Sequence, residues 1–268
     1  MFRSHQILVV TSCICWITIQ ASGSSSFNVV EKNTCSGRLG GRIIEGQIAP
    51  DGAFPYQASL RRSQRHSCGG SILNERWILT AAHCLTGLSD GGLNVVVGTN
   101  ELNSGGTVYK SVKILYHHKY NIHNVINDVG LVKVNATIKF SEKVKPVTLA
   151  NRDVDFDNYP ATLAGWGIHQ KNGYTVSNEL RYYSTCLLSK KKCEERISLA
   201  NGYQKICTFT RYGQGACNGD SGSPLVTDGM QIGITSYVIN SCADGNPDVF
   251  TRVYSYLDWI KDQITKYS

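Results

Sequence analysis

The sequence predicts an all-β protein, either a sandwich or a barrel. Short β-branched and apolar runs recur from Ile43 onward, with Gly-Gly, Asn-Gly and Asp-Gly steps between them. Many short strands joined by glycine-rich turns are typical of these two architectures. The runs that we expect to be strands span residues 57–60, 77–80, 95–98, 108–115, 129–134, 161–164, 231–236 and 249–253.

Helical spacing occurs in only two segments. Residues 193–199 are long enough for a turn or two, and residues 254–267 carry aliphatic side chains at steps of three and four. The basic run 190–192 is expected to be a solvated loop and no nucleic-acid site, because the formal charge of +7 is moderate. Residues 144–158 have the weakest pattern and are the expected linker between two halves of the sheet-rich part.

The first 42 residues are expected to be a signal peptide and a leader that precede the folded domain. Residues 1–23 have the layout of a signal peptide, with a short basic start, an uncharged apolar run at 7–19 and then small residues. That run is shorter than the roughly 20 residues that cross a membrane. Residues 24–42 are polar and rich in Ser and Gly, which suits a removable leader. We therefore expect a secreted, extracellular protein that is not bound to a membrane.

Secretion determines how the ten cysteines are interpreted. Cys13 and Cys15 lie in the signal peptide, and an even number of cysteines in an oxidising compartment favours disulfides. No cysteine pair has zinc-type spacing with an accompanying histidine. The stretch 98–107 holds one carboxylate, whereas calcium requires several oxygen ligands. We expect no metal ion and no organic cofactor.

Three short stretches carry residues suited to amide hydrolysis. They are Thr80-Ala81-Ala82-His83-Cys84, Asn127-Asp128-Val129-Gly130-Leu131 and Gly219-Asp220-Ser221-Gly222-Ser223-Pro224. The reaction needs a nucleophile, a base that deprotonates it and a group that orients the base. Ser221 can attack if an imidazole accepts its proton, and His83 can accept it because imidazole titrates near neutrality. Asp128 would accept a hydrogen bond from the other ring nitrogen.

The glycines near Ser221 matter for the same chemistry. The N–H groups of Gly219 and Ser221 can point together at one developing oxyanion and form an oxyanion hole. Gly219 and Gly222 also lack side chains that would obstruct a substrate backbone.

In the chain order His, Asp, Ser, these motifs resemble the chymotrypsin/trypsin family of serine endopeptidases. The resemblance extends from Ile43 to about Tyr267 and is nearest to the invertebrate chymotrypsin-like branch, with its chymotrypsin, elastase and collagenolytic members. It implies two six-stranded antiparallel Greek-key β-barrels and a C-terminal helix. Within a catalytic domain at 43–268, the expected bounds are about 43–150, 151–253 and 254–267.

The resemblance also implies that the protein is made as an inactive zymogen. Arg42-Ile43-Ile44-Glu45-Gly46 resembles the family's activation site, and residues 24–42 would be the propeptide. A cut by a trypsin-like protease after Arg42 would free the α-amino group of Ile43, which in the family pairs with the residue matching Asp220. A buried carboxylate without a partner is costly, so the new cation would draw Asp220 inward and shape the oxyanion hole.

The resemblance pairs six cysteines into Cys68–Cys84, Cys193–Cys207 and Cys217–Cys242. Whether Cys35 and Cys186 pair with each other stays open. Asn135-Ala136-Thr137 is a sequon for glycosylation in an expected surface loop.

The substrate-binding residues that the resemblance implies are Gly215, Ala216, Asn218, Ser236, Tyr237, Val238 and Asp248. Gly215 leaves the floor of the primary pocket uncharged, where a trypsin-like enzyme has Asp, and Val238 narrows the pocket. Asp248 could still meet a basic side chain. We expect a chymotrypsin- or elastase-like preference for medium apolar residues at P1, the residue before the scissile bond, with some breadth. Tyr237 is expected to present an aromatic face to the next substrate residue, beside backbone hydrogen bonds at Ser236.

Two other functions fit the sequence less well than an active endopeptidase. A protease homologue that works as a binding adaptor would typically have lost a triad residue, and all three are present. A cascade protease would usually carry a recognition module, for which the leader is too short. The expected partners are protein or peptide substrates, an activating trypsin-like protease and protein protease inhibitors, and the expected state is a monomer.

Overall fold

The computed structural model describes residues 46–170, 173–197, 202–209 and 211–268. The expected signal peptide, the propeptide, Arg42 and Ile43 lie outside these residues, and so do Cys35 and Leu199. Within the described part, no helix is both long enough and apolar enough to span a bilayer.

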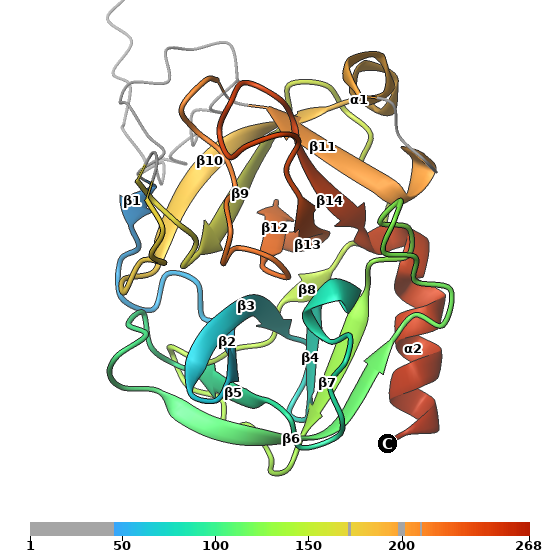
Figure 1. The fold of residues 1–268 in the computed structure, drawn as a ribbon. Coiled ribbons are helices and arrows are strands. Elements are labelled where there is room, and N and C mark those ends of the chain that lie inside the picture. Colours follow the sequence, from blue (N-terminus) through green and yellow to red (C-terminus); the bar gives the residue numbers. More distant parts are fainter. Residues whose placement is uncertain (1–45, 171–172, 198–201, 210) are drawn as a thin grey trace, which may run out of the picture. The chain divides into compact units, whose positions relative to one another are not determined.

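Six antiparallel strands close into a first barrel in the order β2-β3-β4-β7-β6-β5 (Figure 1). Its interior is an apolar cluster that includes the fully buried Leu60, Ile78 and Leu131. The strands are β2 (Gln57–Arg62), β3 (Arg65–Ile72), β4 (Trp77–Thr80), β5 (Asn94–Val97), β6 (Thr107–Tyr116) and β7 (Gly130–Val134).

The second barrel also has six antiparallel strands, and it closes because β10 pairs with both β9 and β11. The strands are β9 (Pro160–Gly165), β10 (Arg181–Leu188), β11 (Lys205–Phe209), β12 (Pro224–Thr227), β13 (Met230–Tyr237) and β14 (Asp248–Arg252). Two short strands extend this sheet: β1 (Gln47–Ile48) pairs with β10, and β8 (Thr148–Leu149) runs parallel to β13. Two six-stranded barrels are the expected fold class.

The C-terminal helix α2 (Leu257–Lys266) packs on the first barrel, although it follows the last strand of the second (Figure 1). A 3₁₀ turn, η3 (Val253–Tyr256), precedes it, so the α-helix begins later than the pattern at 254–267 suggested. Ile260 is buried in the first barrel's cluster. The Lys133 ammonium donates to the carbonyl of Tyr267 and fixes the end of the helix.

The expectation of a loop at 190–192 is wrong. These residues form the first turn of α1 (Lys190–Arg196), because the Ser189 hydroxyl caps the helix by accepting a hydrogen bond from Lys192 N–H. The Lys190 and Lys192 ammonium groups form ion pairs with Asp153 and Asp157. The run therefore belongs to a paired helical surface.

Candidate active site

Pairing of β4 with β7 brings His83 to Asp128. Thr80 lies opposite Gly130 in this antiparallel ladder, so the residues just after β4 meet those just before β7. His83 Nδ1 lies 2.8 Å from Asp128 Oδ2, and the His83 backbone N–H donates to Oδ1 at 2.9 Å. The carboxylate thus holds both the ring and the backbone of His83.

Two residues of the second barrel hold Asp128 in turn. The Ser236 hydroxyl donates to Oδ2 at 2.6 Å, and the Thr251 hydroxyl donates to the Asp128 carbonyl at 2.8 Å. Asp128 is fully buried. Burial raises the pKa of Asp128, but hydrogen bonds from His83 and Ser236 and the charge of His83 outweigh it, so the pKa lies below its ordinary value. The site therefore favours the ionised form of Asp128.

Ser221 reaches the same region from the second barrel. Its carbonyl accepts a hydrogen bond from Gly69 N–H at 2.8 Å, and Gly69 follows Cys68, whose disulfide leads to Cys84 beside His83. Among the described residues, no hydrogen bond joins the Ser221 hydroxyl to His83. Catalytic hydrogen bonds are often long in the absence of substrate. The structure therefore contains the His83–Asp128 pair of the expected triad. It also links the Ser221 backbone, through Gly69 and the Cys68–Cys84 disulfide, to the segment that carries His83.

The loop before Ser221 offers two unused backbone donors. The N–H groups of Asp220, Gly222 and Ser223 donate to carbonyls at 2.8–2.9 Å. The N–H groups of Gly219 and Ser221 have no acceptor within the described part of the chain. His66 Nε2 donates a hydrogen bond to the carbonyl of Gly219 at 2.9 Å, and this bond fixes the orientation of the Gly219–Asp220 peptide. Two backbone N–H groups without an acceptor among the described residues are the kind of donors that an oxyanion hole uses.

Gly222 has a different role from the one that the sequence suggested. A Cβ atom there would lie 2.2 Å from Thr80 Oγ1 and 2.5 Å from the Gly69 carbonyl, and its φ is +80°. Glycine is therefore needed so that the Ser221 turn can pack against the first barrel. Its side-chain position faces protein rather than a substrate path.

Asp220 is buried beside a small cavity lined by Gly46, Gly165, Gly167 and Tyr183, among others. Its carboxylate accepts hydrogen bonds from Gly167 N–H at 2.8 Å and Cys217 N–H at 3.0 Å. Burial raises the pKa of Asp220 to about 6, and these two bonds only partly offset it. Among the described residues, no cation pairs with it.

The expected pocket residues come from three neighbouring segments. The Asp248 carboxylate lies against Gly215, where a Cβ atom would be 2.9 Å from it. It accepts hydrogen bonds from Ala216 N–H at 2.9 Å and from the Tyr183 hydroxyl at 3.1 Å. Burial raises the pKa of Asp248 to about 7. An ionisable group therefore lies beside Gly215, the residue that the resemblance places at the floor of the primary pocket.

The other expected pocket residues pack against different clusters. Val238 packs against the apolar cluster that includes Ala216, whereas Tyr237 packs against a separate cluster that includes Val249. Ser236 lies at a β-bulge of β13, which turns its hydroxyl to Asp128. Asn218 is exposed, and its carbonyl accepts a hydrogen bond from Ile168 N–H.

The structure contains the three disulfides that the resemblance implies, Cys68–Cys84, Cys193–Cys207 and Cys217–Cys242. Cys186 lies on β10 and is not free. Because Cys35 is outside the described residues, a Cys35–Cys186 bond stays a prediction. Asn135 is exposed, and its glycosylation is likewise untested.

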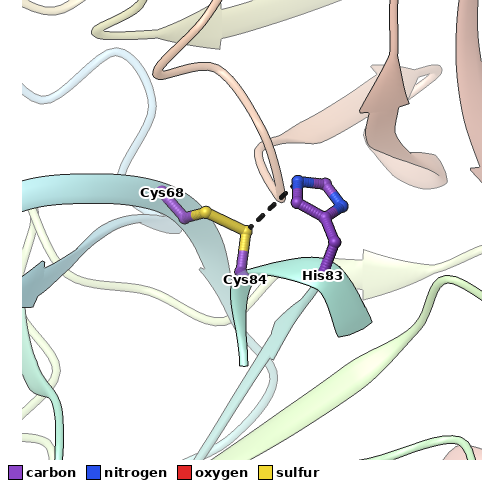
Figure 2. A group of neighbouring side chains, drawn as sticks. All are labelled: Cys68, His83 and Cys84. Atoms are coloured by element: carbon purple, nitrogen blue, oxygen red, sulfur yellow. Dashed lines mark hydrogen bonds between the residues drawn. A yellow bond between two sulfur atoms is a disulfide. The ribbon is translucent and has the colours of Figure 1, made fainter. Parts of the chain in front are cut away.

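The His83 ring lies next to the first disulfide (Figure 2). Cys68, His83 and Cys84 together offer metal-type ligand atoms within 4.8 Å of one another, and His83 Nε2 is 3.7 Å from Cys84 Sγ. The two sulfurs are bonded to each other, so neither is a thiolate. The disulfide therefore holds the turn that carries His83 against β3.

Several residues of the site had no local sequence signal. Thr251, Tyr183 and His66 contact Asp128, Asp248 and Gly219 from distant parts of the chain. None of the three stands in a motif that signals a function, so only the closed barrels reveal its role.

Comparisons with known proteins agree with this geometry. The trypsin family model matches residues 43–260. Chymotrypsin-2 of Vespa crabro is 43% identical over 220 residues, which cover 82% of this chain and 98% of the relative. Trypsin beta of Drosophila erecta is 33% identical, with 83% and 88% covered.

Two solved structures are similar. Neuropsin, a serine protease expressed in mouse brain, has a TM-score of 0.76 at 30% identity, with 82% of this chain and 99% of that chain covered. HL collagenase has a TM-score of 0.74 at 33% identity, with 82% and 97% covered.

Proposed function

Because the chain belongs to the trypsin family and is a serine endopeptidase, we propose that Ser221, His83 and Asp128 are its catalytic triad and that it is secreted as a zymogen. The observation that carries the proposal is the His83–Asp128 pair, together with the N–H groups of Gly219 and Ser221, which have no acceptor among the described residues. In this proposal, the pair supplies the base for the Ser221 hydroxyl and the N–H groups supply the oxyanion hole.

The reaction follows from these positions. Asp128 fixes the Nδ1–H tautomer of His83, so that Nε2 accepts the proton of Ser221 as its oxygen attacks the substrate carbonyl. The N–H groups of Gly219 and Ser221 stabilise the oxyanion. His83 then gives the proton to the leaving amine, and water hydrolyses the acyl-enzyme by the same route.

Activation by cleavage is supported by the state of Asp220. Because burial raises the pKa of Asp220 to about 6, ionised Asp220 without a cationic partner makes the folded state less stable at neutral pH than an unperturbed carboxylate would. The α-amino group of Ile43, freed by a cut after Arg42, would supply the missing cation. The cavity beside Asp220 is bordered by Gly46, three residues after Ile43, which is a suitable distance for such an approach.

We propose that P1 is a medium apolar residue, because Val238 narrows the pocket and Asp248 is partly protonated at neutral pH. Above pH 7 the carboxyl group of Asp248 is mostly ionised, so kcat/KM for substrates with a basic residue at P1 should then rise. The signal-like residues 1–23 support secretion. The proposal also includes that a trypsin-like protease activates the precursor, that protein inhibitors bind the enzyme and that the enzyme is a monomer.

Treatment with trypsin tests this function. The purified precursor should gain hydrolysis of leucyl peptide amides by at least 100-fold, and the new N-terminus should read Ile-Ile-Glu-Gly. Arg42→Gln should be secreted, remain uncut at this site and stay inactive. Equal activity of the uncut and cut forms would contradict the zymogen proposal, and a cut but inactive protein would contradict the triad.

A further inference from the structure

Lys205 is a buried lysine next to the candidate active site. It begins β11, and only 2% of its surface is exposed. Its ammonium donates a hydrogen bond to the carbonyl of Val125 and lies 5.3 Å from the centre of the Tyr237 ring. Within the described part of the chain, no carboxylate forms an ion pair with it.

This environment is costly for a cation. Burial lowers the pKa of Lys205 to about 8, and the negative charge of Asp128 partly offsets it. Lys205 is therefore mostly charged at neutral pH. An apolar side chain of the same length would avoid the desolvation penalty, so stability alone does not account for a lysine here.

The ammonium joins two segments that border the candidate active site. Val125 lies three residues before Asp128 and has a positive φ of 48°, so this turn depends on contacts that hold it. Thr251, which lies opposite Lys205 in the β11–β14 ladder, donates to the Asp128 carbonyl. On its other side, Lys205 supports the Tyr237 ring on β13.

We propose that Lys205 is a positioning residue that holds the Val125 turn and the Tyr237 ring at the spacing needed by the substrate segment preceding P1. This inference rests on the proposed function, since Tyr237 is expected to contact that segment. Lys205 itself is too buried to touch the substrate. Loss of the Lys205 side chain should weaken the binding of extended substrates selectively and should leave the rate of the chemical step at Ser221 unchanged.

Charged and titratable groups surround Lys205 on each neighbouring element. Asp128 faces it from the first barrel, and Tyr237 faces it from β13. The Arg252 guanidinium on β14 donates to the Lys205 carbonyl and pairs with Asp153. Asp128 in turn interacts with His83, Tyr120 and Tyr256, and Tyr256 interacts with Tyr203.

The test compares two p-nitroanilides that share leucine at P1, an acylated tetrapeptide and an acylated single residue. Both are assayed with trypsin-activated enzyme whose active sites have been titrated. Lys205→Met should lower kcat/KM for the tetrapeptide about tenfold, mainly through KM, which is the order of a lost charge-assisted hydrogen bond. The change for the single residue should stay below twofold.

Lys133→Met is the matched control. Lys133 also donates to a backbone carbonyl, that of Tyr267, and lies 5.7 Å from an aromatic ring, that of Trp77, but it does so at the end of α2. This variant should keep the wild-type ratio of the two kcat/KM values. A general loss of packing would change both variants alike.

Wild-type enzyme gives a second measurement, which needs no variant. The tetrapeptide-to-single-residue ratio should fall between pH 7 and pH 9, as Lys205 loses its proton. Any pH effect on the triad or on the Ile43 amine acts on both substrates and cancels in the ratio. A ratio that is equal in Lys205→Met and wild type, or constant over this pH range in wild type, would overturn the proposal. Wild-type enzyme inactive on both substrates would instead refute the proposed function.

Discussion

Buried carboxyl groups in the two barrels have different hydrogen-bond partners and opposite pKa shifts. Asp128, two residues before the first barrel's β7, receives hydrogen bonds from a histidine ring, a backbone N–H and a hydroxyl. Asp220 and Asp248, in the second barrel, each receive two hydrogen bonds from the described residues, all from neutral groups. The pKa is lowered in the first case, and raised to about 6 and about 7 in the others.

This difference shows that burial alone does not decide the charge of an acid. Asp128 has a cationic partner whenever His83 is protonated, which is when catalysis needs its negative charge. Asp220 and Asp248 lack a cation among the described residues, so each is suited to receive one. For Asp220 that cation would be the new N-terminus, and for Asp248 it would be a substrate side chain.

The largest effect that separates the two regions is expected from Asp128→Asn. The amide would keep the shape but hold the wrong His83 tautomer, so kcat should fall by roughly 10⁴-fold at neutral pH. The measurement is hydrolysis of a leucyl peptide amide by the activated variant, normalised to folded protein by circular dichroism. A fall of less than tenfold would show that Asp128 does not orient the base.

A smaller loss of activity is expected from Asp248→Asn, which is the matched control for Asp128→Asn. Its kcat/KM for a leucyl substrate should stay within about threefold of wild type, because the carboxyl group of Asp248 is already partly neutral near pH 7.

The pH dependence of P1 selectivity sharpens the same prediction. A raised pKa means that Asp248 is neutral below about pH 7 and charged above it. The ratio of lysyl to leucyl kcat/KM in wild type should therefore rise about tenfold from pH 6 to pH 8, and it should stay flat in Asp248→Asn. An equal rise in both proteins would place the responsible charge elsewhere.

Much of the fold could be predicted from the sequence, because alternating β-branched runs mark strands locally. The eight expected runs all fall on or next to observed strands. The expected runs do not include four of the barrel strands, β3, β10, β11 and β12, or the two-residue strands β1 and β8. β3 contains Cys68, Gly69 and Gly70, and glycines weaken a strand pattern, although here they permit close packing against β4 and Ser223. β11 begins with a lysine, which favours no buried strand.

The candidate site was predictable to the extent that its chemistry lies in contiguous motifs. His83, Asp128 and Ser221 each stand in such a motif, whereas Thr251, Tyr183 and Lys205 do not. Their contacts arise from strand pairing over long sequence distances, such as Lys205 opposite Thr251. No local pattern encodes that register, so these supporting residues required the structure.

The most direct test of the proposed triad is covalent labelling of the activated enzyme with a serine-directed sulfonyl fluoride, followed by peptide mass spectrometry. Because only a hydroxyl deprotonated by a neighbouring base reacts rapidly, one adduct on Ser221 is expected. Labelling should require the cut after Arg42 and should be lost in His83→Ala. Rapid labelling of another serine, or none at Ser221 in a fully active preparation, would contradict the assignment.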